Sequence, residues 1–160
     1  MELRSGVSKT KKLAISGIVM ALYVVIMIVT QGFAFGPIQV RIATTLYALA
    51  YIYPFLVLPL GLSNVLSNML GGLGPFDIIG GGLVGIIASL LVYSIRRYRI
   101  NTFAIILPII FVPGLVVPIW LTGLTHVPYK ALAISLCLGQ VIPAVLGAAL
   151  VKTLKGKIGE

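Results

Sequence analysis

The feature that most constrains the fold is a series of long apolar runs that follow one another along almost the whole chain. Hydrophobic residues make up 59% of the 160 residues and charged residues only 9%, whereas soluble domains carry about 25% charged residues. Apolar runs of roughly 20 residues are typical of membrane-spanning helices. The sequence therefore predicts an all-α integral protein of the cell membrane, in which residues 1–160 form a single transmembrane domain.

The apolar runs predict about six transmembrane helices. The second run is short for a full crossing, and Pro54 and Pro59 are expected to bracket a tight turn after it. The expected spans are Leu13 to Val29, Ile42 to Tyr53, a third run that ends near Leu70, Ile78 to Ile95, Thr102 to Leu121, and Ala131 to Val151.

The basic residues predict how the helices are oriented. The 12 Lys and Arg residues outnumber the 3 acids, and most fall in clusters beside the apolar runs, at Arg4 to Lys12, Arg96 to Arg99 and Lys152 to Lys157. Because loops rich in Lys and Arg stay on the cytoplasmic side, residues 1–12 and 152–160 are expected to be cytoplasmic tails. No basic patch alternates with aromatic residues, so the expected partner is the lipid bilayer and not nucleic acid.

The few polar residues argue against enzyme chemistry. The acids are Glu2, Asp77 and Glu160, which leaves no carboxylate pair for acid–base catalysis. A lone His126 and a lone Cys137 give no cluster for a metal ion, and no other cofactor is implied. The sequence has no P-loop, so another subunit would have to hydrolyse ATP if transport depends on it.

Polar side chains in the membrane region gather toward the expected outer side. Gln39 and Arg41 follow the first span, and Asp77 follows a glycine-rich loop on the same side. Asn68 and Trp120 lie on the same side, Asn64 lies one turn deeper, and Gln140 lies near the middle of the last span. Ionisable residues within a membrane indicate a functional site by default, and this segregation predicts a small-molecule site in which Arg41 and Asp77 are partners.

Several of these residues could instead have purely structural roles. Arg41 could extend to the outer headgroups, and Asp77 could serve only as a helix N-cap. Asn64 and Asn68 could simply hold helices together. Gly17 and Ala21 lie four residues apart on the first span, where small residues let helices approach closely; this stripe could pack within the protein or dock on another subunit.

Two strings of residues resemble a known family: F-G-P-I-Q-V-R-I at residues 35–42 and G-G-L-G-P-F-D at residues 71–77. Both are similar to the QueT family, the substrate-binding S components of energy-coupling factor (ECF) transporters that are assigned to queuosine precursors. The resemblance is strong from about Ile15 to Ile95 and extends in outline to the last two helices. It implies a bundle of about six helices that binds its ligand near the outer surface.

The same resemblance implies partners and residue roles. An S component docks on a transmembrane T subunit that carries two cytoplasmic ATPases, here through Gly17 and Ala21. A small heteroaromatic ligand would be bound by eight residues, with Gln39 and Arg41 closing over it and the aromatic side chains stacking on it: Phe35, Gln39, Arg41, Asn64, Asn68, Asp77, Trp120 and Gln140. Thr44 and Gln140 stand where QueT-like sequences commonly carry glutamates. The alternatives are therefore an S component for a different vitamin-like molecule, or a channel or structural protein outside the ECF class.

Overall fold

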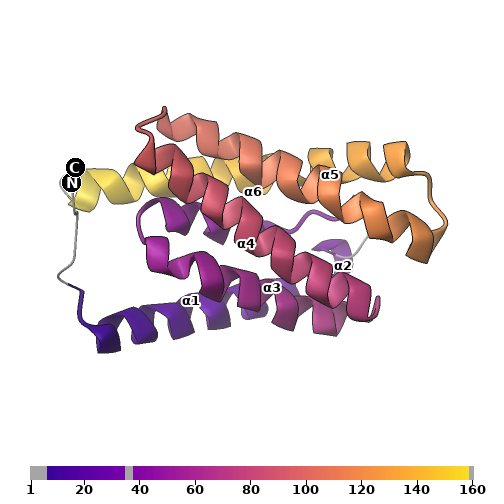
Figure 1. Ribbon diagram of the computed structural model, residues 1–160, viewed down its shortest axis with the longest axis horizontal. Coiled ribbons are helices and arrows are strands. Elements are labelled where there is room, and N and C mark those ends of the chain that lie inside the picture. The colour runs from indigo at the N-terminus through magenta and orange to yellow at the C-terminus, as the bar shows by residue number, and fades with distance from the viewer. Residues whose placement is uncertain (1–6, 35–37, 159–160) are drawn as a thin grey trace.

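The computed structural model describes residues 7–34 and 38–158 as a bundle of helices that run along one long axis (Figure 1). No β-strand occurs within these residues, so the predicted all-α class is confirmed. In chain order the helices are α1 (Lys9–Val29), α2 (Gln31–Ala34), η1 (Ile42–Tyr51), η2 (Pro54–Leu56), α3 (Val57–Gly71), α4 (Pro75–Arg97), η3 (Thr102–Ile105), α5 (Ile106–Thr125) and α6 (Tyr129–Ile158), where η marks a 3₁₀ helix.

Five helical segments of the described chain are long and apolar enough to cross a membrane. Each extends a few residues beyond the span expected from the sequence; in α1, for example, the Ser8 hydroxyl caps the helix by accepting from the Lys11 amide at 3.3 Å, so that Lys9 begins the helix. The five segments are Lys9–Val29, Pro54–Gly71, Pro75–Arg97, Thr102–Thr125 and Tyr129–Lys157. The protein is thus a multi-pass membrane protein.

The remaining expected span, η1, is a 3₁₀ helix of ten residues. A 3₁₀ helix rises about 2 Å per residue, so η1 reaches about 20 Å, less than the roughly 30 Å of a bilayer core. It lies inside the bundle in contact with α6, α4 and α1. Small residues allow this close packing: a Cβ on Gly147 of α6 would lie only 3.0 Å from the Cβ of Ala48. The second expected span is therefore an internal rod within the bundle.

The turn expected between Pro54 and Pro59 is shorter than the sequence suggested. Pro54 begins η2, but Pro59 lies within the first turn of α3. The first four amides of an α-helix have no partner within the helix, so a proline there removes no hydrogen bond. The helix can therefore start at Val57, before the second proline.

Helices α3 and α4 pack closely through glycines. A Cβ on Gly85 would lie 3.1 Å from the Cα of Gly61 and 3.3 Å from the Asn64 Cβ, and a Cβ on Gly61 would lie 3.1 Å from the Gly82 carbonyl oxygen. Close backbone approach through small residues is the usual way in which membrane helices associate. Here it brings the polar side chains of α3 within reach of the α4 backbone.

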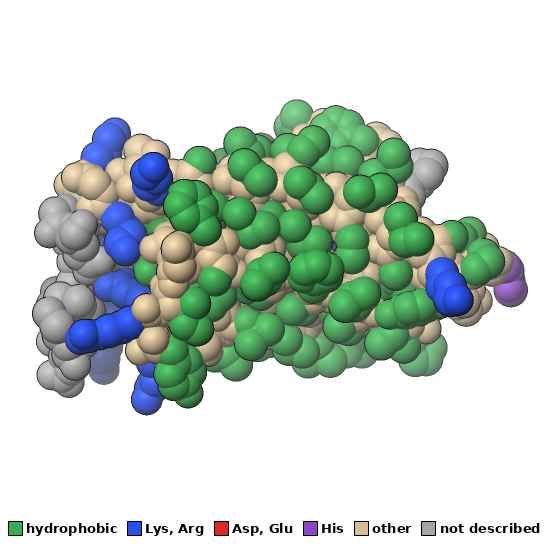
Figure 2. Space-filling model, turned by 90° about the horizontal axis from the view of Figure 1, so that it is seen from above, with side chains coloured by type: hydrophobic (Ala, Val, Ile, Leu, Met, Phe, Trp, Pro, Cys, Tyr) green, Lys and Arg blue, Asp and Glu red, His purple; other side chains and the backbone are tan. Residues whose placement is uncertain are grey.

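The two ends of the bundle differ in charge. Figure 2 shows Lys and Arg side chains gathered at one end, a broad apolar middle, and a basic side chain near a histidine at the other end. Both described chain ends lie at the basic end (Figure 1). This agrees with the predicted topology, in which the basic end faces the cytoplasm and the connections α3–α4 and α5–α6 face outward.

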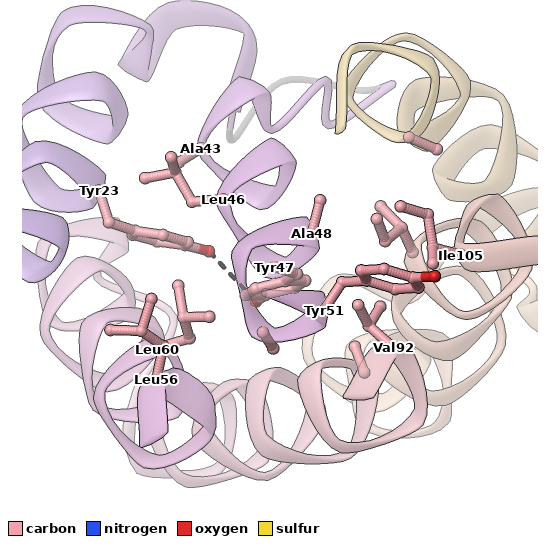
Figure 3. Close-up of a cluster of buried hydrophobic side chains, with 14 of the residues drawn as sticks. Tyr23, Ala43, Leu46, Tyr47, Ala48, Tyr51, Leu56, Leu60, Val92 and Ile105 are labelled. Carbon is pink, nitrogen blue, oxygen red and sulfur yellow. Dashed lines mark hydrogen bonds between the residues drawn. The ribbon is translucent and has the colours of Figure 1, made fainter. Parts of the chain in front are cut away.

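The apolar core surrounds η1. In Figure 3, Tyr47 points toward Tyr23 of α1, whereas Tyr51 extends the other way, toward Ile105. Tyr23 and Tyr47 are both fully buried. At the C-terminal end of η1, Arg96 of α4 donates to the carbonyl oxygens of Tyr51 at 2.9 Å and Ile52 at 3.0 Å. The last carbonyl groups of a helix have no partner within the helix, so the arginine caps this end of η1.

Candidate functional site

Arg41 is the charged centre of a buried polar cluster. It immediately precedes η1 and is only 5% exposed. Its NH1 atom donates to Asn68 Oδ1 at 2.9 Å and lies 3.5 Å from Asn64 Oδ1. Arg41 thus points into the bundle, so the alternative in which it extends to the outer headgroups is wrong.

Asn64 and Asn68 hold both α4 and Arg41. Asn64 Nδ2 donates to the Gly81 carbonyl at 2.6 Å, and Asn68 Nδ2 donates to the Asp77 carbonyl at 2.8 Å. The two asparagines are four residues apart on α3, and the carbonyl groups that they contact are four residues apart on α4 in the opposite direction. The two antiparallel helices therefore form the same hydrogen bond twice, one helical turn apart. Because these donations fix how each amide is turned, both Oδ1 atoms face Arg41. The asparagines therefore join the two helices and also hold Arg41 in a buried polar cluster.

Two tyrosines extend this polar cluster. Tyr47 OH accepts from Asn64 Nδ2 at 2.9 Å and lies 3.2 Å from Tyr23 OH. Neither tyrosine was predicted from the sequence. The sign that could have found Tyr47 is a spacing of three residues: in a 3₁₀ helix, side chains at i and i+3 eclipse, so Arg41, Thr44 and Tyr47 follow one face of the rod.

Thr44 connects the rod to α6. Its hydroxyl lies 2.7 Å from the Arg41 carbonyl oxygen and 2.7 Å from the Gln140 Oε1 position. Thr44 and Gln140 are buried at 1% exposure each. This contact spans 96 residues of sequence, and it places Gln140 beside Arg41.

Gln39 is held against α6 in an unusual backbone conformation. Its φ is +46°, in the left-handed region that side chains other than glycine rarely adopt. Opposite it stands Gly139, where a Cβ would lie 3.0 Å from the Gln39 carbonyl oxygen. The missing side chain at Gly139 therefore gives room for this segment, and Gln39 is 7% exposed.

These elements enclose a small cavity. Its volume is about 10 Å³, close to what a single water molecule needs. One wall is polar and the other, from α4, α5 and α6, is apolar; together they are Gln39, Arg41, Thr44, Tyr47, Asn64, Val84, Pro113, Val117, Leu136 and Gln140. Across residues 7–34 and 38–158, no three His, Cys, Asp or Glu side chains form a group that could hold a metal ion.

Asp77 does not border this cavity. Trp120 Nε1 donates to Asp77 Oδ1 at 3.1 Å, and the Trp120 ring lies on Gly80, where a Cβ would be 2.8 Å from it. Gly74 is the N-cap of α4, and Asp77 stands in the first turn, so the N-cap alternative is wrong. Asp77 Oδ2 is buried and has no hydrogen-bond partner among the described atoms.

The eight predicted binding residues thus separate in space. Arg41 and Asp77 are connected through Asn68, which accepts from the first and donates to the backbone of the second. Phe35 lies outside the described residues. Four predicted residues border the cavity: Gln39, Arg41, Asn64 and Gln140. Asn68 does not border it but contacts Arg41. Asp77 of α4 and Trp120 of α5 form a separate pair between these two helices.

The predicted docking residues lie elsewhere, on the face of α1 that points away from the bundle. Gly17 and Ala21 are exposed, and a Cβ on Gly17 would meet no atom within 4 Å. Within the described bundle, the small-residue stripe therefore does not pack against another helix, so the internal-packing alternative is wrong. The position of the stripe agrees with a surface that faces lipid or another protein.

A comparison with protein families identifies the chain. The QueT transporter family matches it over residues 13–156. The chain belongs to the QueT transporter family. Comparisons with curated proteins and with solved structures gave no match. Membership of the QueT family extends over both the segment of strong resemblance and the last two helices, and it makes the protein a membrane transport protein.

Proposed function

We propose that this QueT-family protein is the substrate-binding subunit of an ECF-type importer and captures a queuosine precursor or a related deazapurine from the outer side. The observation that carries the proposal is the cavity around Arg41. A buried arginine surrounded by amides and hydroxyls is costly within a membrane, and such groups are typical of a site that orients a small polar ligand.

The two walls of the cavity suit a flat heteroaromatic ring. Val84, Val117 and Leu136 supply an apolar surface for a ring face, and Arg41, Asn64 and Gln140 supply hydrogen-bonding groups for a ring edge. A ring of this kind needs much more space than about 10 Å³, so binding has to move at least one wall. Phe35 and Trp120 are the proposed stacking partners, and Asp77, which does not border the present cavity, is the proposed acceptor for the neutral amino group on the ligand ring once a wall has moved.

The partner subunits are part of the same proposal. Only 17% of the apolar stretch of α1 is buried, compared with 39–44% in the other four long helical segments. Of these five segments, α1 therefore leaves the most surface for a partner. A transmembrane T subunit would dock along Gly17 and Ala21, and two cytoplasmic ATPases would supply the energy. Residues 1–160 would act as one transmembrane unit with cytoplasmic tails.

The experiment is native mass spectrometry of the detergent-purified protein with a panel of deazaguanines and vitamins. A bound deazaguanine is the expected result. Arg41→Gln should abolish binding, whereas Lys130→Gln, which removes an exposed charge at the outer end, should not change it. Binding of a different vitamin would replace the ligand but keep the subunit role, and absence of any ligand would favour a channel or structural protein.

A further inference from the structure

The hydroxyl of Thr44 decides how the Gln140 amide is turned. A hydroxyl has one proton, yet Thr44 Oγ1 lies 2.7 Å from two oxygen positions, the Arg41 carbonyl and Gln140 Oε1. It can donate to only one of them, and two oxygens at this distance without a proton between them repel. Oxygen and nitrogen of a glutamine amide are assigned from the hydrogen-bond network and not from their positions.

Both contacts are satisfied when the Gln140 amide is turned over. Thr44 then donates to the Arg41 carbonyl, and Gln140 Nε2 donates to the Thr44 hydroxyl oxygen. This arrangement turns Gln140 Oε1 away from Thr44. Since Gln140 borders the cavity, its oxygen is then available to accept a hydrogen bond from a ligand, beside the second Nε2 proton, which can only be donated.

The charge that borders the cavity is positive. Of the ten residues in its walls, Arg41 carries a full charge and the others are amides, hydroxyls or apolar groups. The carboxylate of Asp77 is outside these walls and accepts from Trp120. A cationic group that entered the cavity would lose its hydration and meet Arg41, and both effects disfavour the charged form of a buried group.

We propose that this cavity selects its ligand by charge: it takes a neutral lactam edge, a carbonyl beside an N–H, and disfavours a cationic ligand. The ligand carbonyl accepts from Arg41, and the ligand N–H donates to Gln140 Oε1. Gln140 is the residue that determines this specificity, because it presents an acceptor without a negative charge. The inference rests on the proposed function, since it names the charge class of the ligand for the same site.

The test compares two ligands that share a lactam ring and differ in charge: a 7-deazaguanine with a neutral nitrile group and one with an aminomethyl group, which is cationic at pH 7. We expect the native protein to bind the nitrile compound at least about tenfold more tightly in isothermal titration calorimetry, because close charges in a buried site change affinity by at least this factor. Gln140→Glu adds a carboxylate and should shift the ratio of affinities by at least about tenfold toward the cation.

The control is Gln31→Glu, the same chemical change at an exposed residue of the outer end, which should leave the ratio unchanged. Equal binding of both ligands, or tighter binding of the cation by the native protein, would overturn the inference while leaving the proposed function intact. A shift in Gln140→Glu no larger than in Gln31→Glu would overturn the role of Gln140. Binding of neither compound would instead remove the proposed function and the inference together.

One further variant keeps the test decisive if Gln140→Glu does not fold. Gln140→Met has a similar length and no strong acceptor, so it should weaken the two lactam ligands by the same factor. A loss confined to one ligand would contradict the assignment of Gln140 to the shared lactam edge. The ratio measured for the native protein decides the charge preference without any variant.

Discussion

The guanidinium of Arg41 meets the amide of Asn68 across the bundle, with NH1 2.9 Å from Asn68 Oδ1. The same amide donates from its Nδ2 to the Asp77 carbonyl on α4. The Asn68 amide therefore uses both its acceptor and its donor. The contact ties the segment before η1 to the α3–α4 pair.

The first prediction concerns this contact. Asn68→Leu keeps the size of the side chain but removes a hydrogen bond from a buried charge and another from a helix carbonyl. We expect it to lower the free energy of unfolding by about 2 kcal/mol, measured by denaturation in detergent micelles. Met69→Leu, at an exposed neighbouring position, is the control and should be neutral. Equal stability of the two variants would contradict the assigned contact.

The second prediction concerns close packing at Gly81. A Cβ there would strike the Asn68 amide and lie 3.6 Å from Asn64 Nδ2, so Gly81→Ala should displace both asparagines. We expect a loss of about 2 kcal/mol in stability, as for other overpacked positions, and weaker ligand binding. Gly123→Ala is the matched control: it is also helical, but a Cβ would meet nothing within 4 Å, so alanine should be neutral or stabilise by up to about 1 kcal/mol.

The third prediction concerns the C-terminal end of η1. Arg96 is partly buried and donates to two carbonyl oxygens at the end of the rod, so Arg96→Gln should lower stability by about 1 kcal/mol. Arg97→Gln, which removes the same charge at the next and exposed position, should leave the thermal midpoint unchanged. If both variants shifted the midpoint alike, the effect would come from charge and not from capping.

The sequence predicted the long helices well because their apolar length leaves few alternatives. It predicted η1 less well, since Ile42 to Tyr53 is too short for an α-helical span and periodicity alone does not distinguish an internal 3₁₀ rod from a short membrane helix. The decisive factor is close contact with distant glycines such as Gly147. Such contacts depend on tertiary packing, which the local sequence does not encode.

The candidate site shows the same division. Arg41 and Asn68 were predicted from their polarity within apolar surroundings, and the structure brings them into contact. Tyr47 was missed because an α-helical repeat of 3.6 residues does not align it with Arg41 and Thr44, whereas a repeat of three does. The contact of Thr44 with Gln140 crosses 96 residues, and no spacing rule predicts such a pair. Direct pairing of Arg41 with Asp77 was expected from charge, but Asn68 stands between them.

The fourth prediction concerns Asp77 and Trp120. Trp120→Phe removes the N–H donor to a buried carboxylate, and we expect it to cost about 2 kcal/mol of stability. In an Asp77→Leu background the same change should cost less, because no carboxylate remains to be left unpaired. A double-mutant cycle on thermal unfolding should therefore give a coupling of about 1–2 kcal/mol. Additive effects of the two substitutions would show that the bond contributes nothing.

The last prediction concerns the exposed face of α1. Gly17→Leu and Ala21→Leu should leave folding and ligand binding unchanged, because the side chain at Gly17 would enter open space and Ala21 is exposed. If a membrane partner packs closely on this stripe, a leucine there costs about 1–3 kcal/mol, so complex formation in co-purification should weaken about tenfold or more. Gly123→Leu on α5 is the control, since its Cβ also meets open space, and should permit assembly. Normal assembly of the Gly17 and Ala21 variants would move the partner surface to another helix, and loss of ligand binding in them would contradict the exposed position of the stripe.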